Sequence, residues 1–176
     1  MTNVITRQRC KWCEEDSQLI QYHDEEWGRQ VTDNDALFEA LTLEIFQAGL
    51  SWKTILHKRE NFRAAFEGFK IDRVADFDSE KVEKLLQDKG IVRHRRKIES
   101  TIENAKIAQE IIKREGSLIS FFTSLSDEKA DKQKAIKTTF CHVGLTTAES
   151  FLQAAGFSEP DHAPTCFLFK KKEAAE

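Results

Sequence analysis

Apolar residues recur at helical spacing along most of this chain, and few helix-breaking residues interrupt them. Ile98, Ile102, Ala105 and Ile112 fall on one face of a long helix, which Gly116 is placed to end. Only 7 of the 176 residues are glycine and 2 are proline, and no segment shows the apolar–polar alternation of a strand. The sequence therefore predicts an all-α fold.

Further helices are expected wherever a capping residue precedes apolar residues spaced three or four apart. They are expected around residues 35–45, 52–66, 79–86 and 144–155. The polar, lysine-rich stretch 126–138 lacks this spacing and is expected to be the least structured part of the chain. The charged tail 170–173 is expected to be frayed.

Size and charge limit the class of protein. At 176 residues the chain is long enough for one full core, and we expect residues 1–176 to form a single domain and a monomer. The formal net charge of −3 argues against a uniformly basic nucleic-acid binder but allows a local basic face. No apolar run approaches the ~18 residues of a membrane span and no signal-peptide pattern is present, so we expect a cytoplasmic protein.

A lone acid stands among the residues that supply the chain's polar aromatic rings. All three tryptophans and the single tyrosine fall between residues 12 and 52, and Glu44 lies there among apolar neighbours. A buried carboxylate is costly unless something binds it, and flat rings nearby favour a flat ligand with hydrogen-bond donors. The pattern indicates a pocket for a modified nucleobase, although any one of Trp12, Tyr22, Trp27 and Trp52 is as easily a core residue.

Cysteine and histidine occur near both ends of the chain. Cys10 and His23 lie near the start, and His162 and Cys166 near the end; two sulfur and two nitrogen ligands suit a tetrahedral zinc site. Such a site would join the two ends of the chain. From spacing alone, two alternatives stay open: a Cys-x-x-Cys half-site formed by Cys10 and Cys13, or no metal site at all.

A glycine turn followed by basic residues separates two predicted helices. Its sequence is Gly90-Ile91-Val92-Arg93-His94-Arg95-Arg96-Lys97. Backbone N–H groups at a helix start bind phosphate, and arginine and lysine add affinity. Because basic side chains oppose the helix dipole there, a function is favoured over a merely solvated helix start. The pattern predicts a helix-hairpin-helix element, about residues 80–113, that holds a DNA strand through Gly90, Arg93, Arg95 and Lys97.

Several motifs occur in one order along nearly the whole chain. They are Arg9-Cys10-Lys11-Trp12, Tyr22-His23-Asp24-Glu25-Glu26-Trp27-Gly28, Leu43-Glu44, Gln47-Ala48-Gly49-Leu50-Ser51-Trp52, Lys58-Arg59-Glu60-Asn61, Gly90-Ile91-Val92-Arg93-His94 with Lys97-Ile98, Ser150-Phe151-Leu152-Gln153-Ala154 with Gly156, and Asp161-His162 with Cys166. Together they make the chain resemble the bacterial 3-methyladenine DNA glycosylase I family.

The resemblance implies a fold, a metal and a reaction. It implies an all-helical, helix-hairpin-helix glycosylase fold with one structural Zn²⁺ and a reaction that releases 3-methyladenine from alkylated double-stranded DNA by base flipping. By the same resemblance, the catalytic residue Glu44 hydrogen-bonds the base, Trp52 stacks on it, and Tyr22 is a polar aromatic wall. Trp12, from the same aromatic cluster, is a further candidate for substrate binding. The implied zinc ligands are Cys10, His23, His162 and Cys166, which leaves out Cys13 and Cys141.

The candidate pocket departs from the family's pattern. Leu19 stands where the family usually has a second tyrosine, and Ile45 and Phe46 replace a glycine and a polar residue after Glu44. We expect Ile45 and Phe46 to lie at the pocket mouth and to narrow or redirect the choice of base. Loss of a stacking ring at Leu19 acts in the same direction.

Other departures lie outside the pocket. Arg96 replaces a small residue, Glu149 replaces an aromatic one and is expected to repel phosphate, and segment 123–140 is shorter and lacks tryptophan. Three hypotheses follow: a glycosylase, a non-catalytic or altered-specificity DNA-damage-binding module on the same scaffold, and a helical zinc protein unrelated to DNA. Release of base from methylated DNA separates the first two, and DNA affinity tests the third.

Overall fold

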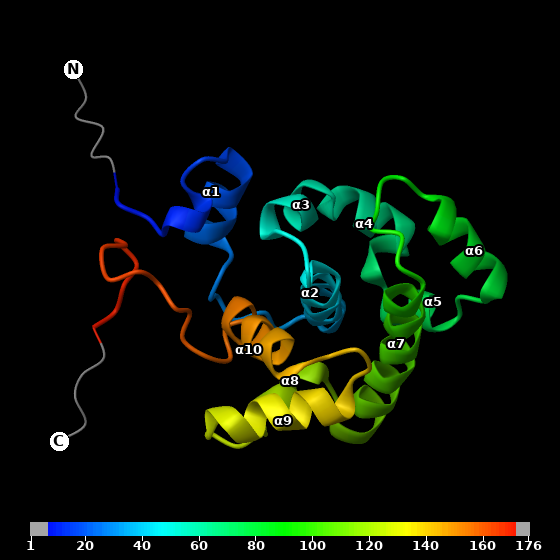
Figure 1. The fold of residues 1–176 in the computed structure, drawn as a ribbon. Coiled ribbons are helices and arrows are strands. Elements are labelled where there is room, and N and C mark those ends of the chain that lie inside the picture. Colours follow the sequence, from blue (N-terminus) through cyan, green and yellow to red (C-terminus); the bar gives the residue numbers. More distant parts are fainter. Residues whose placement is uncertain (1–6, 172–176) are drawn as a thin grey trace.

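All regular structure in the described part of the chain, residues 7–171 of a computed structural model, is helical (Figure 1). The all-α prediction is therefore confirmed over this range, while residues 172 and 173 of the charged tail 170–173 lie outside it. In chain order the elements are η1 (Lys11–Cys13), α1 (Ser17–Glu25), α2 (Asn34–Gln47), α3 (Trp52–His57), α4 (Arg59–Ala65), η2 (Glu67–Phe69), α5 (Ile71–Ala75), α6 (Ser79–Gln87), α7 (Arg95–Glu115), α8 (Leu118–Thr123), α9 (Lys129–Thr139) and α10 (Leu145–Ala154).

Helix α2 lies at the centre of the molecule, and other helices surround it (Figure 1). It packs against α3, α5, α7, α8 and α10, and every residue from Leu41 to Phe46 is buried. A helix that is enclosed on all sides buries apolar residues on all its faces. This explains why large apolar residues stand on both sides of Glu44 in the sequence. The other end of α2 is fixed by Asn34, whose side-chain oxygen accepts the Leu118 N–H at 2.8 Å.

The long helix predicted from the sequence is α7, which Gly116 ends. A tight turn, residues 88–94, joins α6 to α7, and within it the Asp88 carboxylate accepts the Gly90 N–H at 2.8 Å. A Cβ atom on Gly90 would lie 3.1 Å from the side chain of Asn61, so the close approach of α4 favours glycine here. The turn and the start of α7 therefore hold a fixed position against α4.

Two expectations about helices are wrong. The stretch 126–138 contains helix α9, because Ile136 is fully buried and the helix packs against α10. One anchoring residue and an ion pair between Lys129 and Glu149 hold a segment that is otherwise polar. The helix expected over 52–66 is interrupted at Lys58, between α3 and α4.

The two ends of the described chain lie on the same side of the molecule, beside α1 (Figure 1). The Phe167 N–H donates to the carbonyl of Gln8 at 2.9 Å, and the Gly28 N–H donates to the carbonyl of Ala154 at 3.2 Å. The first bond joins the two ends to each other, and the second joins the segment after α1 to the end of α10. Within residues 7–171, no helix combines the length and the apolar character needed to cross a membrane.

Candidate functional site

Glu44 lies in the last turn of α2 and is almost wholly enclosed, with 6% of its surface exposed. No ion pair and no hydrogen bond to another described residue compensates the burial of its carboxylate, and burial alone raises the pKa of Glu44 to about 8. An uncompensated buried acid is costly, and such groups concentrate at functional sites. The structure therefore supports the interpretation of Glu44 as a ligand-binding group.

A cavity of about 510 Å³ opens beside Glu44. Tyr22 from α1 and Trp52 from α3 line it, with ring centroids 5.2 Å apart and planes inclined at 48°. Burial, with a further contribution from the nearby Glu44, raises the pKa of the Tyr22 hydroxyl, so this wall stays neutral. The Trp52 indole N–H is buried without a hydrogen-bond partner among the described residues. The cavity combines apolar walls with a few polar groups, which is typical of small-molecule sites.

Trp12 and Leu19 complete the apolar lining of the cavity. Trp12 is 40% exposed and packs edge-to-face against Trp27, with ring centroids 5.3 Å apart. Leu19, where a second ring was expected from the family pattern, is buried against Tyr22. All the proposed pocket residues, Trp12, Tyr22, Glu44 and Trp52, thus line one cavity. The remaining lining is mostly polar: Lys11, Glu15, Asp16, Gln47, Ser51, Lys53, Ser150 and Gln153, together with Trp27.

The expected positions of Ile45 and Phe46 are wrong. Both side chains are fully buried in the main core, and Phe46 packs against Phe62 at a centroid distance of 4.9 Å. Neither residue lines the cavity beside Glu44. On a helix enclosed from all sides, residues one and two positions after Glu44 point 100° and 200° away from it. These substitutions therefore leave the cavity open, and Leu19 is the departure that changes its wall.

The turn between α2 and α3 presents Leu50, a residue of the Gln47–Trp52 motif for which the sequence predicted no role. Gly49 has φ of +83°, a conformation that glycine adopts without strain, and the next residue, Leu50, is 40% exposed. The adjoining residues Gln47 and Ser51 line the cavity. An exposed leucine directly after a turn glycine, between pocket residues, is the sequence signal that would have identified it.

The predicted phosphate-binding residues have three different environments. Gly90 and Arg93 lie in the turn before α7, and Arg93 is exposed with no ion pair to a described residue. Arg95 is exposed but is paired with Glu83 at 2.7 Å and Glu99 at 3.6 Å. Lys97 is buried, and its Nζ donates to backbone carbonyls of α2 and the following turn. The prediction that Lys97 contacts DNA is therefore wrong, because its ammonium is directed inward.

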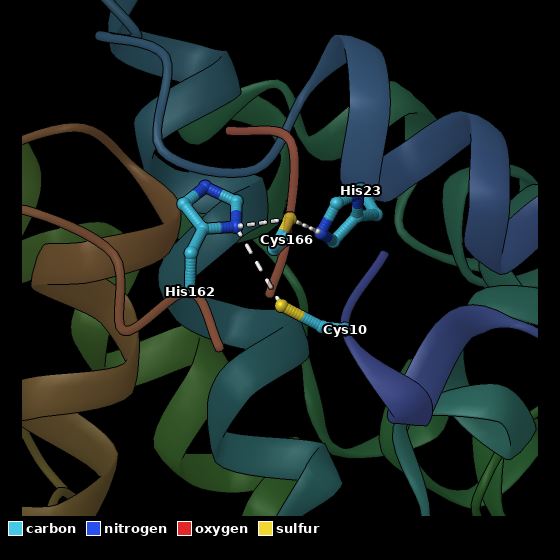
Figure 2. Close-up of side chains that lie close together, drawn as sticks. All are labelled: Cys10, His23, His162 and Cys166. Carbon is cyan, nitrogen blue, oxygen red and sulfur yellow. Dashed lines mark hydrogen bonds between the residues drawn. The ribbon is translucent and has the colours of Figure 1, made fainter. Parts of the chain in front are cut away.

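The four predicted metal ligands converge although they come from opposite ends of the chain (Figure 2). One ligand atom from each of Cys10, His23, His162 and Cys166 lies within 4.8 Å of the other three. The Cys166 Sγ atom is 3.5 Å from both His23 Nε2 and His162 Nδ1, and Cys10 Sγ is 3.6 Å from His162 Nδ1. Cys13 does not join them, since its thiol donates to the Cys10 carbonyl at 3.1 Å.

The geometry of this cluster fits a tetrahedral ion. With a Zn–S bond of about 2.3 Å and a Zn–N bond of about 2.05 Å, tetrahedral sulfur and nitrogen ligands lie about 3.6 Å apart. The other ring nitrogen of His23 is 2.8 Å from the Asp24 carboxylate, which Arg9 in turn binds through two nitrogens at 2.8 and 3.0 Å. A carboxylate behind a histidine is the usual support of a metal ligand. The Ala163 N–H also donates to Cys10 Sγ at 3.2 Å.

The cysteine–histidine cluster adjoins the cavity. His23 follows Tyr22 in α1, and the Trp12 ring contacts the rings of both, at centroid distances of 5.4 and 6.4 Å. Trp27 packs edge-to-face on His162 at 4.7 Å. Walls of the cavity and ligands of the cluster therefore belong to one packed group of rings.

An all-helical scaffold with an aromatic cavity built around one buried acid defines a class of protein that binds a flat, hydrogen-bonding ligand. Comparison with known proteins narrows the class. A sequence model of the methyladenine glycosylase family matches residues 12–140. DNA-3-methyladenine glycosylase 1 of Escherichia coli (strain K12) is 39% identical over 92% of this chain and 97% of its own length. The chain belongs to the methyladenine glycosylase family.

Solved structures agree with the sequence comparison. A crystal structure of 3-methyladenine DNA glycosylase I has a TM-score of 0.85 at 39% identity, covering 93% of this chain and all of the other. A structure that describes 3-methyladenine recognition by 3-methyladenine DNA glycosylase I from Staphylococcus aureus has a TM-score of 0.78 at 30% identity. It covers 90% of this chain and 96% of the other. The helical architecture is thus shared over nearly the whole described chain.

Proposed function

We propose that this chain is a DNA-3-methyladenine glycosylase that hydrolyses the N-glycosidic bond of 3-methyladenine in alkylated DNA. The observation that carries the proposal is the uncompensated Glu44 carboxylate in an aromatic cavity of about 510 Å³. Relatives of the chain over most of its length are DNA-3-methyladenine glycosylases, and one related structure concerns recognition of this base. The site and the relatives point to the same ligand chemistry.

Glu44 is the residue we propose to be catalytic. An adenine alkylated on the ring carries positive charge, so its glycosidic bond is weak and the departing base is neutral. A strong general acid is therefore unnecessary, and recognition of the flipped base is the main task. A carboxylate in a site of low dielectric favours a cationic or N–H-bearing ring over unmodified adenine. Burial raises the pKa of Glu44 to about 8, so its carboxyl group ionises when a hydrogen-bond donor of the base arrives.

The walls of the cavity hold the base in place. Trp52 stacks on the flipped base, and Tyr22, whose ring packs directly on Trp52, forms an adjoining wall. Trp12 covers the entrance at its exposed edge. Stacking of a base on an aromatic ring contributes about 1–3 kcal/mol per base. Leu50, exposed on the turn beside the cavity, is placed to enter the gap that the flipped base leaves in the duplex. Together these contacts stabilise the extruded state.

The turn before α7 is proposed as the helix-hairpin-helix contact to one strand of double-stranded DNA. The Arg93 backbone N–H and the unpaired Arg93 guanidinium suit a phosphate. Gly90 shapes the turn, and its own N–H donates to Asp88. Arg95 contributes less, because Glu83 and Glu99 already neutralise it. Such contacts fix the position of the strand without reading its sequence. We propose that one monomer binds one lesion.

A single structural Zn²⁺ is proposed at Cys10, His23, His162 and Cys166. The convergence of two sulfur and two nitrogen ligand atoms supports it, as does the carboxylate behind His23. Four protein ligands leave no open position, so the ion supplies stability and not chemistry. It would join both ends of the chain beside the pocket walls.

Base release decides the proposal. Duplex DNA treated with a methylating agent is incubated with the wild-type chain and with Glu44→Gln, and the released bases are identified by chromatography. We expect 3-methyladenine from the wild type, and a rate lower by about 10²–10³-fold for Glu44→Gln, the range for loss of one electrostatic group in a site. Equal rates for the two proteins, or no release of 3-methyladenine by either, would reject it.

One observation favours the second candidate, a module of altered specificity or without catalysis. Leu19 occupies the wall position at which the family usually has a ring, so one stacking partner is missing. This candidate predicts affinity for damaged duplex without release of 3-methyladenine, or release of another lesion. The same chromatographic assay therefore separates the two functions when it is combined with a DNA-binding measurement.

A further inference from the structure

Lys97 is the only buried lysine among residues 7–171, with 6% of its surface exposed. It lies in the first turn of α7, directly after the hairpin turn, yet its side chain reaches the C-terminal end of α2. There Nζ donates to the carbonyl of Phe46 at 3.0 Å and to the carbonyl of Ala48 at 2.9 Å. A buried ammonium group is costly unless it has hydrogen-bond acceptors, and here the two backbone carbonyls are its acceptors.

These two carbonyls lie where α2 ends and the next turn begins. We call this turn, residues 48–51, the pocket turn. The last carbonyls of a helix lack intrahelical donors, and a cation there also interacts favourably with the helix dipole. Within the turn, the Leu50 N–H donates to the Gln47 carbonyl at 2.8 Å, and the Gln47 side chain donates to the Leu50 carbonyl at 3.1 Å. Lys97 supplies the donors for the two other carbonyls. The turn is therefore held from inside by α7.

The position of this turn matters for the pocket. Glu44 lies one helical turn before it, Ser51 is its last residue, and Trp52 follows it; all three line the cavity. A glycosylase must hold a phosphate at the hairpin and a flipped base in the pocket at the same time, at a fixed spacing. Lys97 belongs to α7, the helix that follows the hairpin, and its side chain donates a hydrogen bond directly to the pocket turn.

We propose that Lys97 is a positioning residue that fixes the pocket turn, residues 48–51, relative to the DNA-binding hairpin. The inference rests on the glycosylase function proposed above and adds a residue that touches neither base nor phosphate. Without the ammonium group, the pocket and the hairpin both remain, but no hydrogen bond from Lys97 fixes the distance between them. Excision from DNA should then suffer more than binding of the free base.

The test compares three variants. Lys97→Met keeps the length of the side chain and removes its donors; Lys97→Arg restores donors and charge. Asn34→Ala is the matched control, since it removes the bond to the Leu118 N–H at the opposite end of α2, far from the turn. Single-turnover release of 3-methyladenine from methylated duplex, KM for that duplex, and affinity for free 3-methyladenine are measured, with a thermal unfolding curve for each protein.

We expect Lys97→Met to release base at least tenfold more slowly at saturating DNA, with KM and free-base affinity within threefold of wild type. Lys97→Arg should recover part of the rate, and Asn34→Ala should lower only the unfolding temperature. A wild-type rate for folded Lys97→Met, or equal losses for Lys97→Met and Asn34→Ala, would overturn the proposal.

A second measurement does not depend on the reaction. Hydrogen–deuterium exchange of the peptide covering residues 47–52 should be at least tenfold faster in Lys97→Met than in wild type, and unchanged in Asn34→Ala. Unchanged exchange in Lys97→Met contradicts the role of Lys97 whether or not the wild type releases base. Absence of base release by the wild type, with the exchange effect present, instead rejects the proposed function alone.

Discussion

Glu44 ionises less readily in the folded protein than in the unfolded chain, because nothing in the described chain compensates its burial. The pKa rises from an ordinary 4.5 to about 8, so the folded state favours the protonated acid. Burial of Glu44 does not destabilise the folded protein through ionisation below pH 4.5, because the carboxyl group is protonated in both states. Between pH 4.5 and 8 the unfolded chain releases this proton and the folded protein does not, so the free energy of unfolding falls as pH rises.

Replacing Glu44 by glutamine should therefore change how stability depends on pH. The free energy of unfolding of wild type should fall relative to Glu44→Gln as pH rises from 5 to 8, by up to about 1.4 kcal/mol per pH unit. Urea unfolding of both proteins at pH 5, 6, 7 and 8 measures the difference. A difference that does not vary over this range would show that the folded carboxylate is already ionised at pH 5.

Leu50 allows a second residue-scale prediction, since it is exposed and contributes little to the core. If its side chain enters the gap left by the flipped base, Leu50→Ala should lower single-turnover base release about tenfold, equivalent to about 1.4 kcal/mol of lost stabilisation. Affinity for free 3-methyladenine should not change. Leu50→Met, which keeps an apolar side chain of similar length, is the control and should act like wild type. Equal rates for the alanine and methionine variants would contradict the role.

At the scale of helices, the hairpin before α7 offers two arginines in contrasting environments. Arg93 is exposed without an ion pair to a described residue, whereas Arg95 is paired with Glu83 and Glu99. Each phosphate contact steepens the salt dependence of binding to double-stranded DNA by about 0.9 in log–log slope. Arg93→Gln should therefore reduce that slope by about one, and Arg95→Gln by clearly less. Fluorescence anisotropy of a labelled duplex at several salt concentrations measures both, and a larger effect at Arg95 would contradict the assignment.

The helices show which parts of the fold are encoded locally. Helices α2 and α7 follow from periodicity and caps, because each has an apolar pattern that no turn interrupts. Helix α9 does not, because it depends on one buried isoleucine, Ile136, and on contact with α10. The direction of Lys97 was equally hidden, since a basic residue after a glycine turn looks the same whether it faces DNA or a helix end. Tertiary contacts decided both cases.

At the scale of the whole molecule, the pocket and the cysteine–histidine cluster pack against each other. Spacing left the ligand set open, because Cys10 and Cys166 are separated by nearly the whole chain, and only the family resemblance selected it. In the structure the set converges, and Trp12 and Trp27 join its histidines to the cavity. The two ends of the described chain therefore meet beside the pocket, as the proposed single domain requires.

Loss of the proposed ion should therefore affect both stability and ligand binding. We expect about one zinc per chain by elemental analysis. Cys166→Ser should lose it and unfold about 10 °C or more below wild type, which at 2–4 °C per kcal/mol corresponds to several kcal/mol. Affinity for free 3-methyladenine, followed by tryptophan fluorescence, should fall as well, because Trp12 and Tyr22 pack beside the ligand His23.

Cys141→Ser is the control, since Cys141 lies outside the cluster. The metal site is rejected if the wild-type protein contains no zinc and the two serine variants unfold at the same temperature. The convergence of the four residues would then reflect packing alone.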